Sequence, residues 1–199
     1  MSAKSSIRRG AGIAPDWDQE TGGALAKLIR DGAGKQLPVV FGFDNTIVRG
    51  DIGEATLAVL ARSGLLTPAS LSPWICPPLR RPGKALLELR SCADVIEYYS
   101  ALLSPTVHGR EDPSPLSSGY GWAVEVMSGL RLSEVVEATR TAYEMSRPEQ
   151  PGVIEVTPGK TSFPAPSFYP EMVELLAELV RQEFDVWIVS ASNVWSVRW

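Results

Sequence analysis

The sequence has few of the side chains that build zinc centres and thiol sites. Among its 199 residues there are one histidine, His108, and two cysteines, Cys76 and Cys92. A structural zinc site takes four ligands, mostly cysteine and histidine, and this chain does not supply that set. The cysteines form no Cys-x-x-Cys pair, so we expect two free thiols in a reducing compartment.

A serine hydrolase that uses His108 is the alternative left by the single histidine. Such an enzyme of the α/β-hydrolase type places its serine in a Gly-x-Ser-x-Gly elbow, and the sequence contains none. The segment around His108 is rich in serine, proline and glycine. We therefore interpret His108 as a surface loop residue.

Long hydrophobic runs and an excess of positive charge are also missing. No apolar stretch approaches the roughly 20 residues of a membrane span, and no apolar segment follows Arg8 and Arg9 as it would in a signal peptide. The net charge of −4 argues against a nucleic-acid-binding protein. The sequence therefore predicts a soluble, cytoplasmic protein that has neither nucleic acid nor a membrane as its partner.

Two short apolar segments, each followed by polar residues, are the most informative features that are present. The first covers residues 39–43 and leads into a loop with Asp44 and Thr46, and the second covers residues 186–190 and ends at Ser190. Both are apolar at successive positions, which is typical of parallel strands covered by helices. Because ligands bind at the carboxyl ends of such strands, we expect Asp44, Thr46 and Ser190 to face one site.

The rest of the chain alternates helical patterns with proline-rich loops. Asp51 and Gly64 fit the start and the end of one helix. A short strand is expected at residues 153–156. Sequence patterns predict helices over about residues 22–30, 84–103 with a break near Ser91, and 133–145. Two further helices are predicted, one between Asp51 and Gly64 and one that begins at Pro170 and carries an apolar stripe as far as Val180.

Both apolar segments resemble motifs of a known enzyme family. The first motif of the haloacid dehalogenase (HAD) superfamily of phosphatases is Asp-x-Asp-x-Thr after an apolar strand, and the segment similar to it is Gly42-Phe43-Asp44-Asn45-Thr46. The second motif is similar to Ile188-Val189-Ser190-Ala191. Within this superfamily the sequence is most similar to the phosphoserine-phosphatase-like branch, and in that branch to the bacterial phosphorylcholine phosphatases. The similarity lies in three segments, Glu97-Tyr98-Tyr99, Gly121-Trp122 and Met127-Ser128-Gly129.

The resemblance implies a fold and a division of the chain. The fold class would be α/β, an incomplete Rossmann-like HAD core made of a parallel sheet with flanking helices. Residues 1–15 would be a flexible tail. Residues 16–48 and 165–199 would form the partial core. Residues 49–164 would form a helical cap that is inserted between the two motifs and closes over the substrate.

The resemblance also implies roles for individual residues. HAD phosphatases attack phosphorus with a carboxylate, form an aspartyl-phosphate and use Mg²⁺. Gly42 stands at the position of that nucleophile, so the attacking group is lost. Asp44 is expected to act as the acid/base and as a metal ligand. Thr46 and Ser190 are expected at the phosphate group.

The aromatic residues Tyr98, Tyr99 and Trp122 of the implied cap are candidates for substrate specificity. Aromatic faces attract quaternary ammonium groups, and the resemblance implies a small phosphorylated metabolite such as phosphorylcholine. The alternative is that all three side chains form ordinary cap core.

Two departures separate the sequence from an active phosphatase. Gly42 replaces the nucleophile, and the family's third-motif lysine and fourth-motif acids have no counterpart after Ser190. The prediction is a Mg²⁺-dependent phosphomonoester hydrolase by lineage that is inactive as written. The alternatives are a non-catalytic binding or regulatory pseudophosphatase, and one piece of a split enzyme that forms a homodimer or is completed by another polypeptide. In an incomplete core, residues 186–190 would present an open apolar edge and face.

Overall fold

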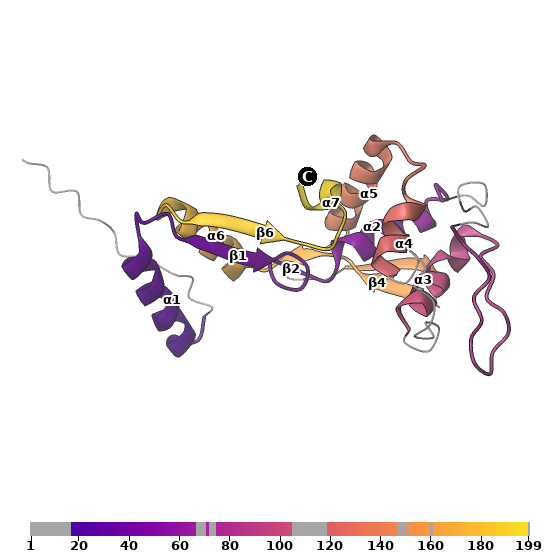
Figure 1. Ribbon diagram of the computed structural model, residues 1–199, viewed down its shortest axis with the longest axis horizontal. Helices are drawn as coiled ribbons and strands as arrows, with labels where there is room; N and C mark the ends of the chain where they lie inside the picture. Colours follow the sequence, from indigo (N-terminus) through magenta and orange to yellow (C-terminus); the bar gives the residue numbers. More distant parts are fainter. Residues whose placement is uncertain are drawn as a thin grey trace, which may run out of the picture. The chain divides into compact units, whose positions relative to one another are not determined.

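The structure is a computed structural model that describes residues 17–66, 71, 75–104, 119–146, 150, 152–159 and 161–198 (Figure 1). It is a mixed α/β chain with helices and small parallel and antiparallel sheets. The described elements are, in chain order, α1 (Gln19–Gly32), β1 (Pro38–Gly42), β2 (Val48–Arg49), α2 (Ile52–Arg62), η1 (Cys92–Asp94), α3 (Val95–Leu103), α4 (Gly119–Val126), α5 (Leu132–Glu144), β3 (Val153–Thr157), β4 (Thr161–Pro164), β5 (Ser167–Phe168), α6 (Pro170–Arg181), β6 (Asp185–Val189) and α7 (Val194–Arg198).

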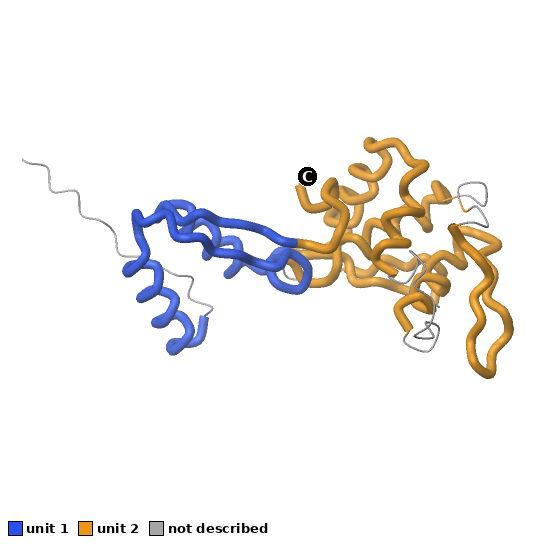
Figure 2. The backbone as a smooth tube through the Cα atoms, in the orientation of Figure 1, with its two compact units in different colours: residues 1–47, 168–189 blue, residues 48–167, 190–199 orange. Residues whose placement is uncertain are grey.

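The chain divides into two compact units (Figure 2). Unit 1 comprises residues 1–47 and 168–189, and unit 2 comprises residues 48–167 and 190–199. Residues 190–198 therefore group with unit 2, whereas the sequence analysis placed them with the partial core. The predicted flexible tail, residues 1–15, lies outside the described residues, and the division into core and cap stays a prediction.

Unit 1 is built on a two-stranded parallel sheet. β1 and β6 pair in register, with Gly42 opposite Val189 at their carboxyl ends. The chain enters β6 from α6, which packs against that strand. The amphipathic pattern of α6 explains this packing, because its buried stripe includes Met172, Leu175 and Leu179.

The two strands are partly exposed. Their two-sided apolar pattern is typical of a sheet covered by helices, but an incomplete core predicted an open apolar edge and face at residues 186–190. In the structure Trp187, Ile188 and Val189 are 58%, 46% and 62% exposed, and Val40 of β1 is 61% exposed. The predicted open apolar surface is therefore confirmed, and the described residues do not cover both faces of the sheet with helices.

Unit 2 contains the main hydrophobic core. Its central helix, α2, is buried along most of its length and packs against α5 and β3. The predicted ends of α2 are confirmed. The Asp51 carboxylate accepts a hydrogen bond from the Glu54 N–H at 2.9 Å, and Gly64 follows the helix with a left-handed φ of 73°.

Other predicted helices differ in their bounds. The helical region expected over residues 84–103 was predicted to break near Ser91, and the structure is helical only from Cys92, with Ser91 as the cap. The part before the break is not helical, because Leu87 pairs with Leu79 in an antiparallel bridge. The helix expected from residue 22 begins at Gln19, since Asp18 caps it through the N–H groups of Glu20 and Thr21. The elements α4, β4 and α7 were not predicted.

Candidate functional site

The carboxyl ends of β1 and β6 lie side by side in unit 1. Gly42 and Val189, the last residues of these strands, are register partners. Asp44 follows Gly42 by two positions along the chain, and Ser190 directly follows Val189. The two motifs therefore leave the sheet from neighbouring strand ends, which is the place where α/β sheets bind ligands.

The loop after β1 places its threonine beside Gly42. A Cβ atom built on Gly42 would lie 3.2 Å from Thr46 Oγ1 and 3.7 Å from Thr46 Cβ. The loop turns back on itself because the Thr46 and Ile47 N–H groups donate to the Phe43 carbonyl oxygen at 3.3 and 2.9 Å. Thr46 is thus the nearest side chain to the point where a carboxylate at position 42 would begin.

Two aromatic rings and one left-handed residue hold this loop in shape. Phe43 is buried, and its ring meets that of Phe168 edge-on, with centroids 6.4 Å apart. Asn45 has a φ of 55°, in the left-handed region that asparagine tolerates better than most residues. Asp44, between them in the chain, is half-buried.

Ser190 is half-buried and belongs to unit 2. Its Oγ accepts a hydrogen bond from the Ser192 N–H at 3.0 Å. This bond gives Ser190 a structural role in the turn that follows β6. A hydroxyl oxygen has two lone pairs as well as its proton, so the bond does not by itself exclude a phosphate contact.

A second group of polar residues surrounds the start of α2 in unit 2. A small cavity there, about 20 Å³, is lined by Asp51, Glu54, Tyr99, Tyr120 and Ser192 among others. The Tyr99 O–H donates to Glu54 Oε1 at 3.0 Å, and the Ser192 hydroxyl lies 3.5 Å from Asp51 Oδ1. The sequence analysis interpreted Asp51 only as the start of a helix and gave Glu54 no role, so this cavity was not predicted.

Burial controls the ionisation of two tyrosines in unit 2. Burial raises the pKa of the Tyr99 phenol far above its ordinary value, and the Glu54 carboxylate raises it further. Burial also raises the pKa of Tyr98, with a smaller contribution from Cys76. Both phenols therefore keep their protons at neutral pH, and Tyr99 acts as the donor toward Glu54.

The three aromatic residues proposed for specificity lie in the core of unit 2. Tyr98, Tyr99 and Trp122 are at most 1% exposed. The indole N–H of Trp122 donates to the Ile75 carbonyl oxygen at 3.0 Å, and the Tyr98 O–H donates to that of Pro77 at 2.6 Å. Trp122 packs on both tyrosine rings. This burial favours the core interpretation, and of the three only Tyr99 borders the small cavity.

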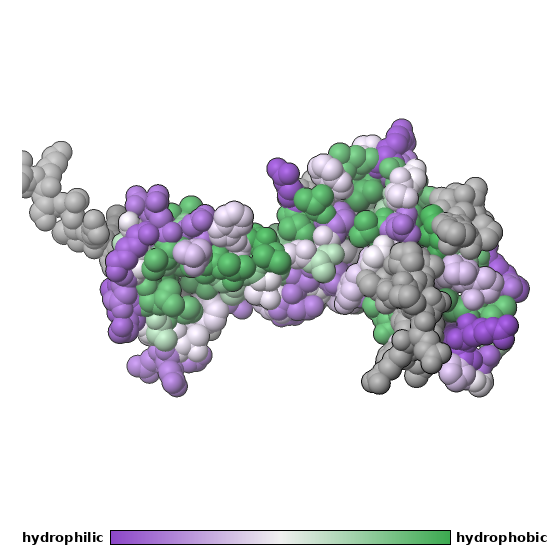
Figure 3. Space-filling view, viewed as in Figure 1, coloured by the Kyte–Doolittle hydropathy of each residue, from purple (hydrophilic) through white to green (hydrophobic). Residues whose placement is uncertain are grey.

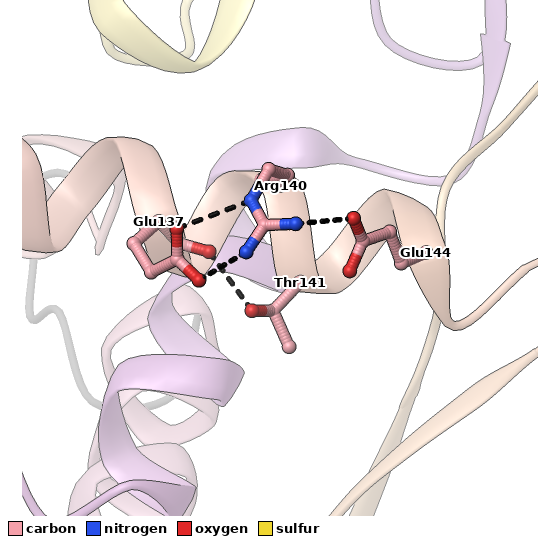
Figure 4. Close-up of polar contacts among 4 residues, drawn as sticks. All are labelled: Glu137, Arg140, Thr141 and Glu144. Atoms are coloured by element: carbon pink, nitrogen blue, oxygen red, sulfur yellow. Dashed lines mark hydrogen bonds and ion pairs between the residues drawn. The ribbon is translucent and has the colours of Figure 1, made fainter.

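A wider groove lies between α2 and α5 in unit 2. It encloses about 580 Å³, and its lining includes Val59, Leu65, Ala138 and Met145. Charged residues of α5 stand beside it (Figure 4), where Arg140 lies between Glu137 and Glu144 and forms ion pairs with both. The groove is mainly apolar, and the carboxylates of Glu134 and Glu137 in its lining are paired with Arg131 and Arg140. It therefore does not offer a catalytic set of residues.

The described residues offer few ligands for a metal ion. Within them, no group of three or more His, Cys, Asp or Glu side chains is placed to hold an ion. Mg²⁺ requires a near-octahedral shell of oxygen ligands, and the loop after β1 contributes the single carboxylate of Asp44. The donors present do not form such a site by themselves, and Mg²⁺ binding stays a prediction.

The cysteines agree with the sequence analysis, and the histidine cannot be placed. Cys76 and Cys92 are free thiols, as predicted. Cys76 is buried, and burial raises the pKa of its thiol, although the neighbouring Trp122 opposes that shift. His108 lies outside the described residues.

Comparisons with known proteins bear on the fold alone. No family model and no curated protein matches this chain. A solved structure does match it, that of a conserved functionally unknown protein from Anaerococcus prevotii DSM 20548, with 17% identity and a TM-score of 0.57. The match covers 96% of this chain but only 65% of that protein. Across the described part of the chain, no helix is both long and apolar enough to cross a membrane.

Proposed function

We propose that this chain is a HAD-type phosphatase by lineage that binds a phosphomonoester and cannot cleave it. The observation that supports the proposal most strongly is the geometry at Gly42. It ends β1, pairs with Val189 immediately before the Ser190 motif, and has Thr46 against its would-be side chain. The covalent route of this family needs a carboxylate at that position, and glycine has none.

What remains at the strand ends suits phosphate binding. The hydroxyls of Thr46 and Ser190 and the backbone N–H groups of the loops are donors of the kind that hold phosphate oxygens. Among the described residues, no complete ligand set holds a metal ion whose charge would balance the phosphate. We therefore expect weak binding, with a Kd of about 1 mM.

The proposed substrate class rests on the sequence resemblance to phosphorylcholine phosphatases. A small phosphorylated metabolite, with phosphorylcholine as the probe, is therefore the class that we favour.

The binding proposal is tested by NMR titration of the isotope-labelled chain with phosphorylcholine and, separately, with inorganic phosphate. The amide signals of residues 42–46 and 190–192 should shift, and Thr46→Val should weaken binding by about fivefold, the equivalent of one hydrogen bond. Thr141→Val, a change of the same size on α5, is the matched control and should leave the affinity unchanged. If none of these amide signals moves at millimolar ligand, the proposal is wrong.

A second candidate function is that of a subunit: the chain would form one part of an enzyme that another polypeptide completes. The specific observation in its favour is the exposed apolar face of the β1–β6 sheet.

A further inference from the structure

A pocket in unit 2 lies apart from the strand ends of unit 1 and from the cavity at the start of α2. It encloses about 410 Å³, and its lining includes Arg81, Pro82 and Lys84 of one turn and Glu97, Ser100 and Ala101 of α3. None of these six residues borders the other two places. Small-molecule sites are concave and enclose about 300–1,000 Å³, so this pocket has room for a small organic ligand.

A hairpin holds two cations at one side of the pocket. At its base Leu79 and Leu87 exchange backbone hydrogen bonds of 2.9 and 3.0 Å. At its tip the Lys84 N–H donates to the Arg81 carbonyl oxygen at 3.2 Å, and Gly83 supplies a left-handed φ of 68°. The ends of a β-turn lie within about 7 Å of each other, so the two cationic side chains start from neighbouring backbone positions. Hydrophilic side chains gather over this hairpin (Figure 3).

The guanidinium group of Arg81 is held in place but only partly used. Its Nη1 donates to Glu97 Oε1 at 2.9 Å, and the Arg81 side chain is 19% exposed. Its Nε is buried and, among the described residues, has no hydrogen-bond partner. A buried donor without a partner is unfavourable, and two N–H groups of one guanidinium together hold a carboxylate in a fork. Arg81 therefore keeps donors for a ligand after its pairing with Glu97.

The charges in the lining leave one positive charge to be balanced. Lys84 is exposed, and its ammonium group has no ion pair within the part of the chain that the structure describes. Glu97 neutralises one of the two cations, so one net positive charge remains. A carboxylate carries one negative charge, whereas a phosphate monoester carries between one and two. The charge of the pocket therefore matches a carboxylate more closely.

We propose that this pocket binds a small organic monocarboxylate. The carboxylate group of the ligand lies between the Lys84 ammonium and the Arg81 guanidinium, and the exposed Ser100 hydroxyl donates to it. Pro82 and Ala101 contact the apolar body of the ligand. The proposal depends neither on the phosphatase lineage nor on the strand ends of unit 1.

The test is an NMR titration of the full, isotope-labelled chain with benzoate, a monocarboxylate that has an apolar ring. The amide signals of residues 81–84 and 97–104 should shift in a saturable way at millimolar benzoate. Benzamide has nearly the same shape and no charge, so it should bind about tenfold more weakly or worse. The proposal is overturned if these signals do not move with benzoate, or if benzamide or inorganic phosphate binds the pocket as tightly as benzoate does.

Two variants with opposite expected effects separate recognition from folding. Lys84→Gln removes the unpaired cation and should weaken benzoate binding by about fivefold. Glu97→Gln removes the competing negative charge, while its amide oxygen can still accept from Arg81, so benzoate should bind about threefold more tightly. Lys35→Gln is the matched control, because it removes the same charge from unit 1, where Lys35 donates to the Asp31 carbonyl oxygen.

The control variant should bind benzoate with unchanged affinity. Equal losses in Lys35→Gln and Lys84→Gln would show a general effect of charge and would overturn the proposal. Weaker binding by Glu97→Gln would overturn it as well, because the carboxylate at that position would then assist the ligand and not repel it.

Discussion

At the scale of single residues, the backbone at Gly42 could carry a side chain, but glycine supplies no carboxylate for the proposed chemistry. The backbone at Gly42 has no left-handed φ, and a Cβ there would meet only Thr46, at 3.2 Å. A side chain is therefore sterically acceptable after a small movement of the threonine. The backbone does not require this glycine. In the proposed lineage it stands where the attacking carboxylate would be.

This argument predicts a contrast between two glycine substitutions. Gly42→Ala should change the free energy of unfolding by less than about 1 kcal/mol, since reduced freedom of the unfolded chain offsets the contact with Thr46. Gly32→Ala should destabilise by about 1–3 kcal/mol, because its Cβ would come within 2.5 Å of the Phe184 ring. Urea unfolding of both variants measures the difference. Equal destabilisation would contradict the geometry described at Gly42.

The buried tyrosines predict an alkaline limit to stability. In the folded state the pKa values of Tyr98 and Tyr99 are raised, so the folded chain keeps protons that the unfolded chain loses above about pH 10. Their contribution to stability is complete below that pH and is lost as the pH rises further. Unfolding free energy measured across this range should fall, and it should fall less steeply in the double variant Tyr98→Phe/Tyr99→Phe. Identical slopes would show that the phenols ionise while folded.

At the scale of elements, a buried set of hydroxyls joins three helices of unit 2. Thr56 of α2, Thr139 of α5 and Ser196 of α7 are all buried and lie within 2.8 to 3.2 Å of one another. Asn193 adds a hydrogen bond from its side-chain N–H to the Ser196 hydroxyl at 2.8 Å. Ser196 is the buried residue of α7, so polar contacts attach this short helix.

Two threonines on α5 provide a matched test of this network. Thr139 and Thr141 each donate to the carbonyl oxygen four residues earlier at 2.9 Å, but only Thr139 also meets Thr56 and Ser196. Thr139→Val should destabilise by about 1–3 kcal/mol, because buried hydroxyls lose a partner. Thr141→Val should change stability by less than about 0.5 kcal/mol. Chemical unfolding followed by circular dichroism compares them, and similar losses in both variants would refute the role of the network.

The same elements show which parts of the fold the sequence could predict. α2 and α6 carry local signals, such as the capping carboxylate of Asp51 and the uninterrupted apolar stripe of α6, and both helices were predicted. α7 is five residues long and is attached through Ser196, a contact that no local pattern reveals. α4 contains two glycines, which have low helix propensity, and it is held by the burial of Trp122. Contacts between residues that are distant in sequence stabilise α4 and α7, and a short stretch of sequence does not reveal such contacts.

At the scale of the whole molecule, burial was harder to predict than strand pairing. The order and polarity of the two apolar segments were enough to predict parallel strands, and the register of Gly42 with Val189 agrees with that. The pattern of the strands alone is typical of a covered sheet, and the exposure of Trp187 was predicted only by way of the resemblance, because an incomplete core leaves residues 186–190 open. The cavity at Asp51 and Glu54 was missed, because it also requires Tyr99 and Ser192, which are distant in sequence.

The central proposal is a phosphoester-binding site of HAD lineage that has lost its nucleophile. Phosphorus NMR of phosphorylcholine incubated with the chain and Mg²⁺ tests it most directly, because one spectrum reports both binding and turnover. The account predicts that the ester signal broadens relative to a sample with no protein, and that no inorganic phosphate signal grows with time. Growth of the phosphate signal in proportion to protein concentration, or an ester signal identical to that of the protein-free sample, would contradict it.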